Sequence, residues 1–244
     1  MQHLSTYSSR AKIGLIVPPT NTVNEAEWRA MAPDQVTFHT TRMRLHADTT
    51  SDAGRAKLWA DLGVAIDLVA PARVDVIAYA CTAGSMLSPP ESVTERMSAL
   101  AGRPCMSTAL AIVLALRHLK AKRIAIATPY HDALNTHETH FLADCGIETL
   151  KIVGLGIGAN GPQEYIRIAE TPLDAVRRHA AGVMVPGADA LLISCTDFPT
   201  LPLIAGLEAE LGVPVISSNT ATLWAALRLA GVNDAIPSAG RLFE

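Results

Sequence analysis

Two cysteines of this chain, Cys81 and Cys195, lie in matching local sequences. Each comes shortly after a largely apolar run, 74–78 for the first and 189–194 for the second, of the kind that forms a buried strand. Each is followed directly by threonine. A thiolate can act as nucleophile or base and a thiol as acid, so two cysteines flanking one carbon could add to it or exchange its proton. A lone cysteine is often a small buried side chain, but the matched pair favours catalysis.

The composition is typical of a globular chain. Of its 244 residues, 49% are hydrophobic and 18% are charged, and the formal net charge is −3. No basic block is present, which argues against a nucleic-acid-binding surface. Residues 1–12 are polar, and no apolar run approaches the length of a membrane span. We therefore expect no signal peptide, no membrane contact and a cytoplasmic location.

The sequence indicates neither a metal centre nor an organic cofactor. The eight histidines are scattered without an HExxH pattern, and no CxxC pair is present. Segment 154–159 partly matches a dinucleotide fingerprint, but the acidic residue expected further on has no clear strand-end setting. A P-loop and a GxSxG elbow are both absent. The four cysteines do not make a disulfide framework in a chain of this size, so we expect a reducing compartment.

Alternating strands and helices must position the two cysteines. The spacing of apolar residues predicts strands over 13–17, 35–44, 74–78, 104–106, 123–128, 149–156, 189–194 and 214–216. It predicts helices over 55–70, 91–100, 107–116, 133–145, 173–185, 202–211 and 221–229, with a further helix that contains Trp28 and Met31. This alternation calls for parallel sheets with helices on both faces, in which ligands bind at the carboxyl ends of the strands.

The order of the elements restarts at about residue 123, which indicates an internal duplication of architecture. We predict an α/β fold of two similar, doubly wound, flavodoxin-like lobes with parallel sheets, related by pseudo-twofold symmetry. Residues 1–105 and the C-terminal segment from about 220 to 244 would form the first lobe, and 106–219 the second. The active site would lie in the cleft between them, with one cysteine from each lobe.

Polar residues that follow the strands have two interpretations. Thr20 and Asn21 follow the first strand, Ser107 and Thr108 open a helix, and segment 217–220 opens the last helix in the same way. Each group could simply cap the helix that follows it. Alternatively, it could direct hydroxyl, amide and main-chain N–H groups at a ligand carboxylate.

The two Cys-Thr pairs in two α/β lobes resemble the aspartate/glutamate racemase superfamily. Segment 195–199 is similar to the second cysteine motif of its amino-acid racemases. The opening lacks their Asp-Ser-Gly signature. Instead, segment 13–18 with Asn21 and Glu25 is similar to the branch that contains maleate cis-trans isomerases and arylmalonate decarboxylases. Further segments similar to this branch are 41–46, 128–130, 199–202 and 239–242, so the resemblance extends to the C-terminus.

The resemblance implies a set of active-site residues. The isomerase pattern marks Asn21, Cys81, Tyr130, Asn160 and Cys195, with the two cysteines as the catalytic pair. The decarboxylase has glycine at the position of Cys81 and keeps only the equivalent of Cys195. The presence of both cysteines therefore argues against a straightforward decarboxylase.

The neighbours of the two cysteines complete the predicted substrate-binding set. These are Thr82 and Ala83 in one half and Thr196 and Asp197 in the other. Segment 82–85 and the pair formed by Asp197 and Phe198 replace more apolar residues of the isomerases, which makes the pocket more polar. Main-chain amides at a helix start would favour a thiolate, whereas Asp197 would oppose it or accept its proton.

The expected function is cofactor-independent isomerisation of a small dicarboxylate, best represented by conversion of maleate to fumarate. Cys81 would add to an alkene carbon and Cys195 would protonate its neighbour, while Tyr130, Asn21 and Asn160 hold the carboxylates. The alternatives are racemisation by two-cysteine proton transfer, arylmalonate-type decarboxylation and carboxylate binding without turnover. The expected partner is a small carboxylate or dicarboxylate, and homo-oligomer formation is left open.

Overall fold

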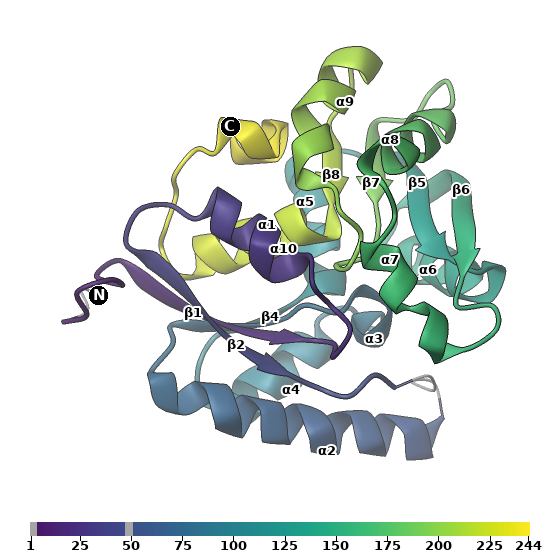
Figure 1. Cartoon of the computed structure of the whole chain (residues 1–244). Coiled ribbons are helices and arrows are strands. Elements are labelled where there is room, and N and C mark those ends of the chain that lie inside the picture. The colour runs from purple at the N-terminus through teal and green to yellow at the C-terminus, as the bar shows by residue number, and fades with distance from the viewer. Residues whose placement is uncertain (1–3, 47–50) are drawn as a thin grey trace.

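The computed structural model describes residues 4–46 and 51–244, whose strands form two four-stranded parallel sheets (Figure 1). The first sheet has the order β2-β1-β3-β4 and the second has the order β6-β5-β7-β8. The strands are β1 (Ala11–Val17), β2 (Val36–Arg42), β3 (Val76–Tyr79), β4 (Cys105–Ser107), β5 (Arg123–Tyr130), β6 (Glu148–Ile157), β7 (Ala190–Ile193) and β8 (Val215–Ser217). The two sheets repeat one topology, which confirms the predicted α/β fold.

Helices lie between successive strands, as the alternation predicted. They are α1 (Asn24–Met31), α2 (Asp52–Val69), α3 (Thr82–Ser85), α4 (Ser92–Ala101), α5 (Thr108–His118), α6 (Asp132–Asp144), α7 (Ile166–Ala169), α8 (Leu173–Gly182), α9 (Ile204–Leu211) and α10 (Ser218–Leu229). Short 3₁₀ helices cover Ala70–Ala72, Pro162–Glu164, Leu201–Leu203, Pro237–Ala239 and Arg241–Phe243. Two of the short helices, α3 and α7, were not expected from the sequence.

The strands that lead to the two cysteines occupy equivalent places. β3 lies between β1 and β4, and β7 lies between β5 and β8, so each is an interior strand. Every residue of both strands is buried. β3 ends at Tyr79 and β7 ends at Ile193, and in each case the cysteine is the second residue after the strand. The topology therefore places Cys81 and Cys195 at corresponding carboxyl ends of two parallel sheets.

The helices after β4 and β8 begin with side-chain caps. Ser107 accepts a hydrogen bond from the N–H of Leu110 at 3.4 Å, and Ser217 accepts one from the N–H of Thr220 at 3.2 Å. The Thr220 hydroxyl oxygen also accepts the N–H of Ser217 at 2.8 Å, which completes a capping box. This box explains why α10 begins at Ser218, earlier than expected, and it supports the capping interpretation for both serines.

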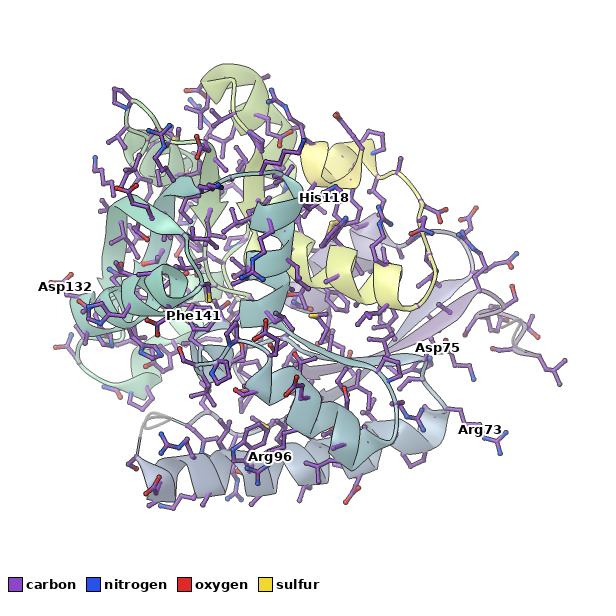
Figure 2. The ribbon with its side chains drawn as sticks, turned by 180° about the vertical axis from the view of Figure 1, so that it is seen from behind. Arg73, Asp75, Arg96, His118, Asp132 and Phe141 are labelled. Atoms are coloured by element: carbon purple, nitrogen blue, oxygen red, sulfur yellow. The ribbon has the colours of Figure 1, made fainter. Side chains whose placement is uncertain are left out.

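One buried apolar cluster runs through both sheets. It contains Ile13 of β1, Ile124 of β5 and Ile216 of β8. Helices α5 and α10 pack against each other within it, and the rings of His118 and Trp224 approach to 5.1 Å between their centroids (Figure 2). The two halves therefore share a core, and the lobe boundaries given above stay a prediction.

The outer face of the first sheet is covered by α2 and α4. The helix predicted over 55–70 is confirmed, and its apolar residues Leu58, Leu62 and Ile66 are all buried. Figure 2 shows Arg96 of α4 lying over α2, where its guanidinium carbon is 4.2 Å from the centroid of the Trp59 ring. This helix layer packs against the sheet face that includes β3, and the packing holds the strand that leads to Cys81.

Candidate active site

Cys195 has an unusual backbone conformation. Its φ is +128°, in the region that residues other than glycine rarely adopt. Its main-chain N–H donates to the hydroxyl oxygen of Ser218 at 2.9 Å, which helps to hold the turn. The side chains of Cys195 and Cys81 are each only 7% exposed. Strained backbone of this kind is concentrated at functional sites, and here it sets the direction of a buried thiol.

The Cys81 thiol faces two hydrogen-bond donors. Burial raises its pKa, while the main-chain N–H of Gly84 and the hydroxyl of Tyr79 act in the opposite direction by stabilising the thiolate. The approach is close enough that a Cβ on Gly84 would lie 2.4 Å from the Tyr79 hydroxyl oxygen and 2.9 Å from the Cys81 sulfur. Glycine at this position therefore lets Tyr79 and Cys81 meet.

The Cys195 thiol lies in less favourable surroundings for a negative charge. Burial raises its pKa to about 12, and the nearby carboxyl of Asp197 acts in the same direction. The Tyr130 hydroxyl and the N–H of Asp197, the latter 3.4 Å from the sulfur, oppose these effects only in part. Burial thus raises the pKa of both thiols, but a neighbouring carboxyl adds to this effect only at Cys195, whereas Cys81 faces two hydrogen-bond donors.

Two tyrosines connect the surroundings of the cysteines. Burial raises the pKa of Tyr130 well above its usual value, and ionisation of Cys195, Glu138 or Cys81 would raise it further. Burial also raises the pKa of Tyr165, again with contributions from both cysteines. Both phenols are thus within electrostatic range of both thiols. Tyr165 was not among the predicted site residues.

Hydroxyl groups tie the two cysteine loops together. The Thr196 hydroxyl donates to the carbonyl oxygen of Ala80 at 3.0 Å, next to Cys81 in the chain. The Thr82 hydroxyl donates to the hydroxyl oxygen of Ser218 at 2.9 Å, and this same oxygen accepts the N–H of Cys195. The predicted residues Thr82 and Thr196 thus hold the loops in register, and Ser218 joins them from segment 217–220.

Asn21 contributes to the same arrangement. It is buried, and its Oδ1 accepts the N–H groups of Val23 and Asn24 at 3.1 and 3.0 Å. Its Nδ2 donates to the hydroxyl oxygen of Thr196 at 3.1 Å. The Asn21 oxygen therefore serves the start of α1, as the capping interpretation proposed, while its amide nitrogen reaches the loop of Cys195.

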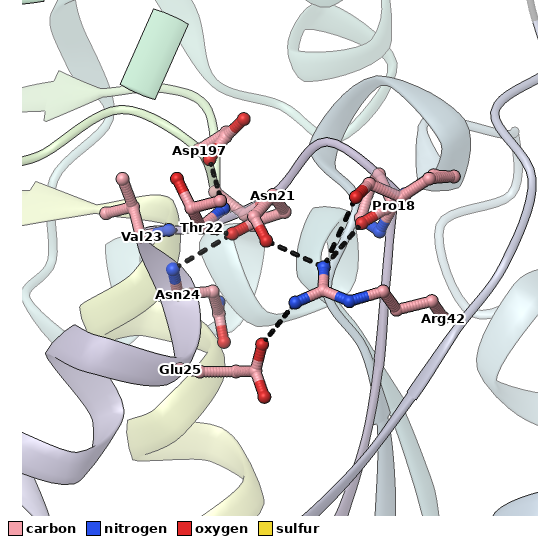
Figure 3. A network of polar contacts seen from close by, with 10 residues as sticks. Pro18, Asn21, Thr22, Val23, Asn24, Glu25, Arg42 and Asp197 are labelled. Carbon is pink, nitrogen blue, oxygen red and sulfur yellow. Dashed lines mark hydrogen bonds and ion pairs between the residues drawn. The ribbon is translucent and has the colours of Figure 1, made fainter. Parts of the chain in front are cut away.

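Arg42 holds the loop that carries Asn21 (Figure 3). Its guanidinium donates to the carbonyl oxygens of Asn21 at 2.7 Å and Pro18 at 3.2 Å, and it forms an ion pair with Glu25 at 2.7 Å. These contacts come from the end of β2, next to the end of β1. Arg42 therefore organises the loop, and these donors are taken by protein groups.

Asp197 reaches the loop of Asn21 from the other half. Its Oδ1 accepts the N–H of Thr22 at 2.9 Å (Figure 3), while its buried Oδ2 has no hydrogen-bond partner. The side chain is 6% exposed. Burial raises its pKa to about 7, against the smaller opposing effects of the Thr22 and Val23 N–H groups and of Arg42. Asp197 therefore changes charge near neutral pH.

Asn160 and Ala83 complete the predicted set. Asn160 is exposed, and its Nδ2 donates to Oε1 of Glu164 at 3.0 Å. Oε2 of Glu164 also accepts the N–H of Gly158 at 2.9 Å, so this carboxylate organises the turn after β6. The structure thus places Asn160 on the turn, engaged with Glu164. Ala83 is half-buried in the first turn of α3, beside Cys81.

Among residues 4–46 and 51–244, no group of three or more His, Cys, Asp or Glu side chains is arranged to hold a metal ion. No described helix combines the length and apolar character needed to cross a membrane. All four cysteines have free thiols.

A comparison with protein families assigns nearly the whole chain. Residues 13–243 match the family model described as arylmalonate decarboxylase. The chain belongs to the arylmalonate decarboxylase family. The resemblance identified from the cysteine motifs is thereby confirmed.

Members of this family with different activities are similar to the chain. A maleate isomerase from Geobacillus stearothermophilus is 32% identical over 253 residues, which cover 96% of this chain and 97% of that protein. An arylmalonate decarboxylase from Bordetella bronchiseptica is 37% identical over 156 residues, or 63% of each chain. The family is thus one of enzymes, and it includes both isomerases and decarboxylases.

A solved family structure carries a covalent intermediate. It is a Cys-to-Ser variant of the maleate cis-trans isomerase from Nocardia farcinica with a covalently bound succinylcysteine. It superposes on this chain with a TM-score of 0.85 and 30% sequence identity, covering 96% of this chain and 98% of that one. A cysteine of a close structural relative therefore forms a bond to a four-carbon dicarboxylate.

Proposed function

We propose that this chain is a cofactor-independent cis-trans isomerase of a small cis-dicarboxylate, with maleate as substrate and fumarate as product. The observation that carries this proposal is that the two thiols have different surroundings, although both affect the pKa of Tyr130 and of Tyr165. Burial raises the pKa of Cys81, and the Gly84 N–H and the Tyr79 hydroxyl offset part of this rise by stabilising a thiolate. Cys195 lies beside Asp197 and keeps its proton, with a pKa of about 12.

In this mechanism Cys81 is the nucleophile and Cys195 the acid. The Cys81 thiolate forms a C–S bond to one alkene carbon, and the π electrons move onto the carboxylate of the other as an enediolate. The Cys195 thiol gives its proton to that other carbon. The bond between the two carbons is now single and rotates. Cys195 then takes a proton back, the C–S bond breaks, and fumarate and the Cys81 thiolate are released.

The remaining polar groups have supporting roles in the proposal. The phenol groups of Tyr130 and Tyr165 stabilise the enediolate, because donors aimed at developing charge in a buried site are effective there. Asn160 contributes a donor to a substrate carboxylate after its amide leaves Glu164. Asn21 and Thr196 hold the two cysteine loops in the geometry that addition and protonation require.

Isomerisation is favoured over decarboxylation by the residue at position 81. The resemblance assigns glycine to this position in the decarboxylase, whereas this chain has a buried cysteine with two donors on its sulfur. The succinylcysteine of the Nocardia farcinica enzyme supports a covalent route. We assign the equivalent adduct in this chain to Cys81.

The proposal is tested with maleate in D₂O, followed by proton NMR. We expect fumarate to form, and we expect Cys81→Ala and Cys195→Ala each to abolish turnover. Cys145→Ala is the matched control, because Cys145 is a free, half-buried thiol at the end of α6. Intact-mass measurement should show one maleate bound to Cys195→Ala and none bound to Cys81→Ala.

A different outcome would assign a different reaction. If maleate is unchanged while the α-proton of an amino acid or another 2-substituted acid exchanges with deuterium, the protein is a racemase and the isomerase proposal is wrong.

A further inference from the structure

Asp197 has one carboxyl oxygen that no protein group uses. Its Oδ1 accepts the N–H of Thr22, whereas its Oδ2 is buried and makes no hydrogen bond. The carboxyl belongs to the same turn as Cys195, whose sulfur accepts the N–H of Asp197 at 3.4 Å. Its unused oxygen therefore lies within the catalytic loop.

A negative charge on a buried oxygen without a donor is unfavourable. A proton on that oxygen removes the charge and creates an O–H group that can itself donate. The Oδ1 atom keeps its bond to Thr22 in either form. The position of the unused oxygen thus favours the neutral acid, which is a donor rather than an acceptor.

The charged groups around Asp197 do not remove the preference of its carboxyl for the neutral form. Arg42 from β2 acts on the carboxyl from a distance, but its guanidinium is bound to the carbonyl oxygen of Asn21 and to Glu25. Cys195 from the same loop is an uncharged thiol near neutral pH. The main-chain N–H groups of Thr22 and Val23 favour the ionised form, and burial outweighs them.

We propose that Asp197 is a specificity-determining residue that acts as a carboxylic acid, donating from its Oδ2 to a carboxylate of a dicarboxylate ligand. When Asp197 is ionised it repels that carboxylate and offers no donor. This inference rests on the proposed function, because it takes a dicarboxylate as the substrate class. It adds that the site binds this class only together with a proton.

Proton-linked binding has a measurable consequence. The pKa of free Asp197 is about 7, so below this value the carboxyl is already protonated and binding takes up no proton. Above it, the dissociation constant of a dicarboxylate should rise about tenfold per pH unit. Each binding event should then take up close to one proton.

Titration calorimetry with succinate tests the inference. Succinate is a saturated dicarboxylate and lacks the alkene that addition requires, so binding is measured without turnover. Titrations at pH 6 and pH 8, on either side of the Asp197 pKa, in buffers with different heats of ionisation, give the number of protons taken up. The wild-type protein should take up almost none at pH 6 and close to one at pH 8.

The matched variants are Asp197→Asn and Asp174→Asn. An asparagine at position 197 keeps an oxygen for the N–H of Thr22 and places an N–H₂ group where the acid donated. It should bind succinate at both pH values without proton uptake and with less than a threefold change in dissociation constant between them. Asp174 is an exposed carboxylate paired with Arg178 in α8, so Asp174→Asn should behave as wild type.

The results separate this inference from the proposed function. Absence of succinate binding at pH 6, absence of proton uptake by wild type at pH 8, or the same uptake by Asp197→Asn would each overturn the role of Asp197, whether or not maleate is isomerised. Proton-linked succinate binding that depends on Asp197, in a protein that leaves maleate unchanged, supports this inference and removes the isomerase assignment. The wild-type titration is decisive even if a variant fails to fold.

Discussion

The hydroxyl of Thr196 donates a hydrogen bond to the carbonyl oxygen of Ala80 at 3.0 Å, so the residue after one cysteine is bonded to the residue before the other. The Thr196 hydroxyl oxygen also accepts the amide of Asn21. These bonds fix the spacing of the two cysteine loops directly, without relying on the packing of distant helices.

Thr196→Val should therefore impair both stability and activity. The substitution preserves the shape of the side chain but leaves the Asn21 amide and the Ala80 carbonyl buried without this partner. We expect the free energy of unfolding to fall by about 1–3 kcal/mol, and kcat to fall about tenfold or more because the thiols are misplaced. Denaturant unfolding and maleate turnover measure the two effects. Thr196→Ser keeps the hydroxyl and should restore both, and a fully active valine variant would contradict the argument.

Tyr79→Phe should make Cys81 harder to ionise. The hydroxyl of Tyr79 stabilises the Cys81 thiolate, so its loss raises the pKa of this thiol further. A hydrogen bond to a charged group contributes about 1.5–3 kcal/mol, which corresponds to a shift of about one to two pH units. The rate of Cys81 alkylation by iodoacetamide, followed by peptide mass spectrometry, should then reach its plateau at a higher pH. Tyr7→Phe, which changes an exposed tyrosine, should leave this profile unchanged.

Gly84→Ala should abolish activity although it changes one hydrogen to a methyl group. The new Cβ would lie 2.4 Å from the Tyr79 hydroxyl oxygen and 2.9 Å from the Cys81 sulfur, so one of these atoms must move. We expect kcat to fall at least about a hundredfold. Gly63→Ala is the matched control, because nothing lies within 4 Å of its added Cβ in α2 and activity should be kept. Equal turnover in the two variants would show that the Tyr79 contact is unimportant.

Glu138→Gln should change how stability depends on pH. Glu138 is fully buried, and burial raises its pKa from 4.5 to about 7 against the opposing effect of the Ser194 hydroxyl. The unfolded chain loses this proton near 4.5 and the folded chain near 7, so rising pH between these values favours unfolding. The contribution is on the order of 3 kcal/mol.

The measurement is denaturant unfolding of wild type and Glu138→Gln at pH 5 and pH 8. Wild type should be less stable at pH 8, and the variant should lose less stability between the two conditions. Part of the pH dependence should remain in the variant, because burial raises the pKa of Asp197 in the same direction. Parallel curves for the two proteins would show that Glu138 does not titrate in this range.

The order of elements could be predicted from the sequence, because long apolar runs and helical spacing are local signals. The short helix α3 could not, since Thr82, Ala83, Gly84 and Ser85 include three residues of modest or poor helix propensity. In the folded loop the Ser85 hydroxyl donates to the carbonyl oxygen of Cys81 at 2.7 Å and accepts the N–H of Ala109 in α5 at 3.0 Å, a tertiary contact that local propensity does not encode.

The meeting of the two cysteine loops could be predicted because motifs at strand ends mark the carboxyl edge of a sheet, and the family resemblance added Asn21; the catalytic role of these residues stays a prediction. Tyr165 was missed because it follows β6 by several residues, and its direction depends on the turn that Glu164 organises. That turn begins after a predicted strand and contains an aromatic residue, which is the signal that could have been used. The free oxygen of Asp197 could not be foreseen, since hydrogen-bond satisfaction depends on Thr22 from the other half of the chain.

The buried cluster that contains Ile13, Ile124 and Ile216 affects how the protein folds. Apolar side chains of both sheets leave water together, so the duplicated halves should melt in one cooperative transition rather than as separable modules. The two cysteine loops then meet only upon completion of folding. A truncated half would expose its share of the interior and carry only one of the two loops.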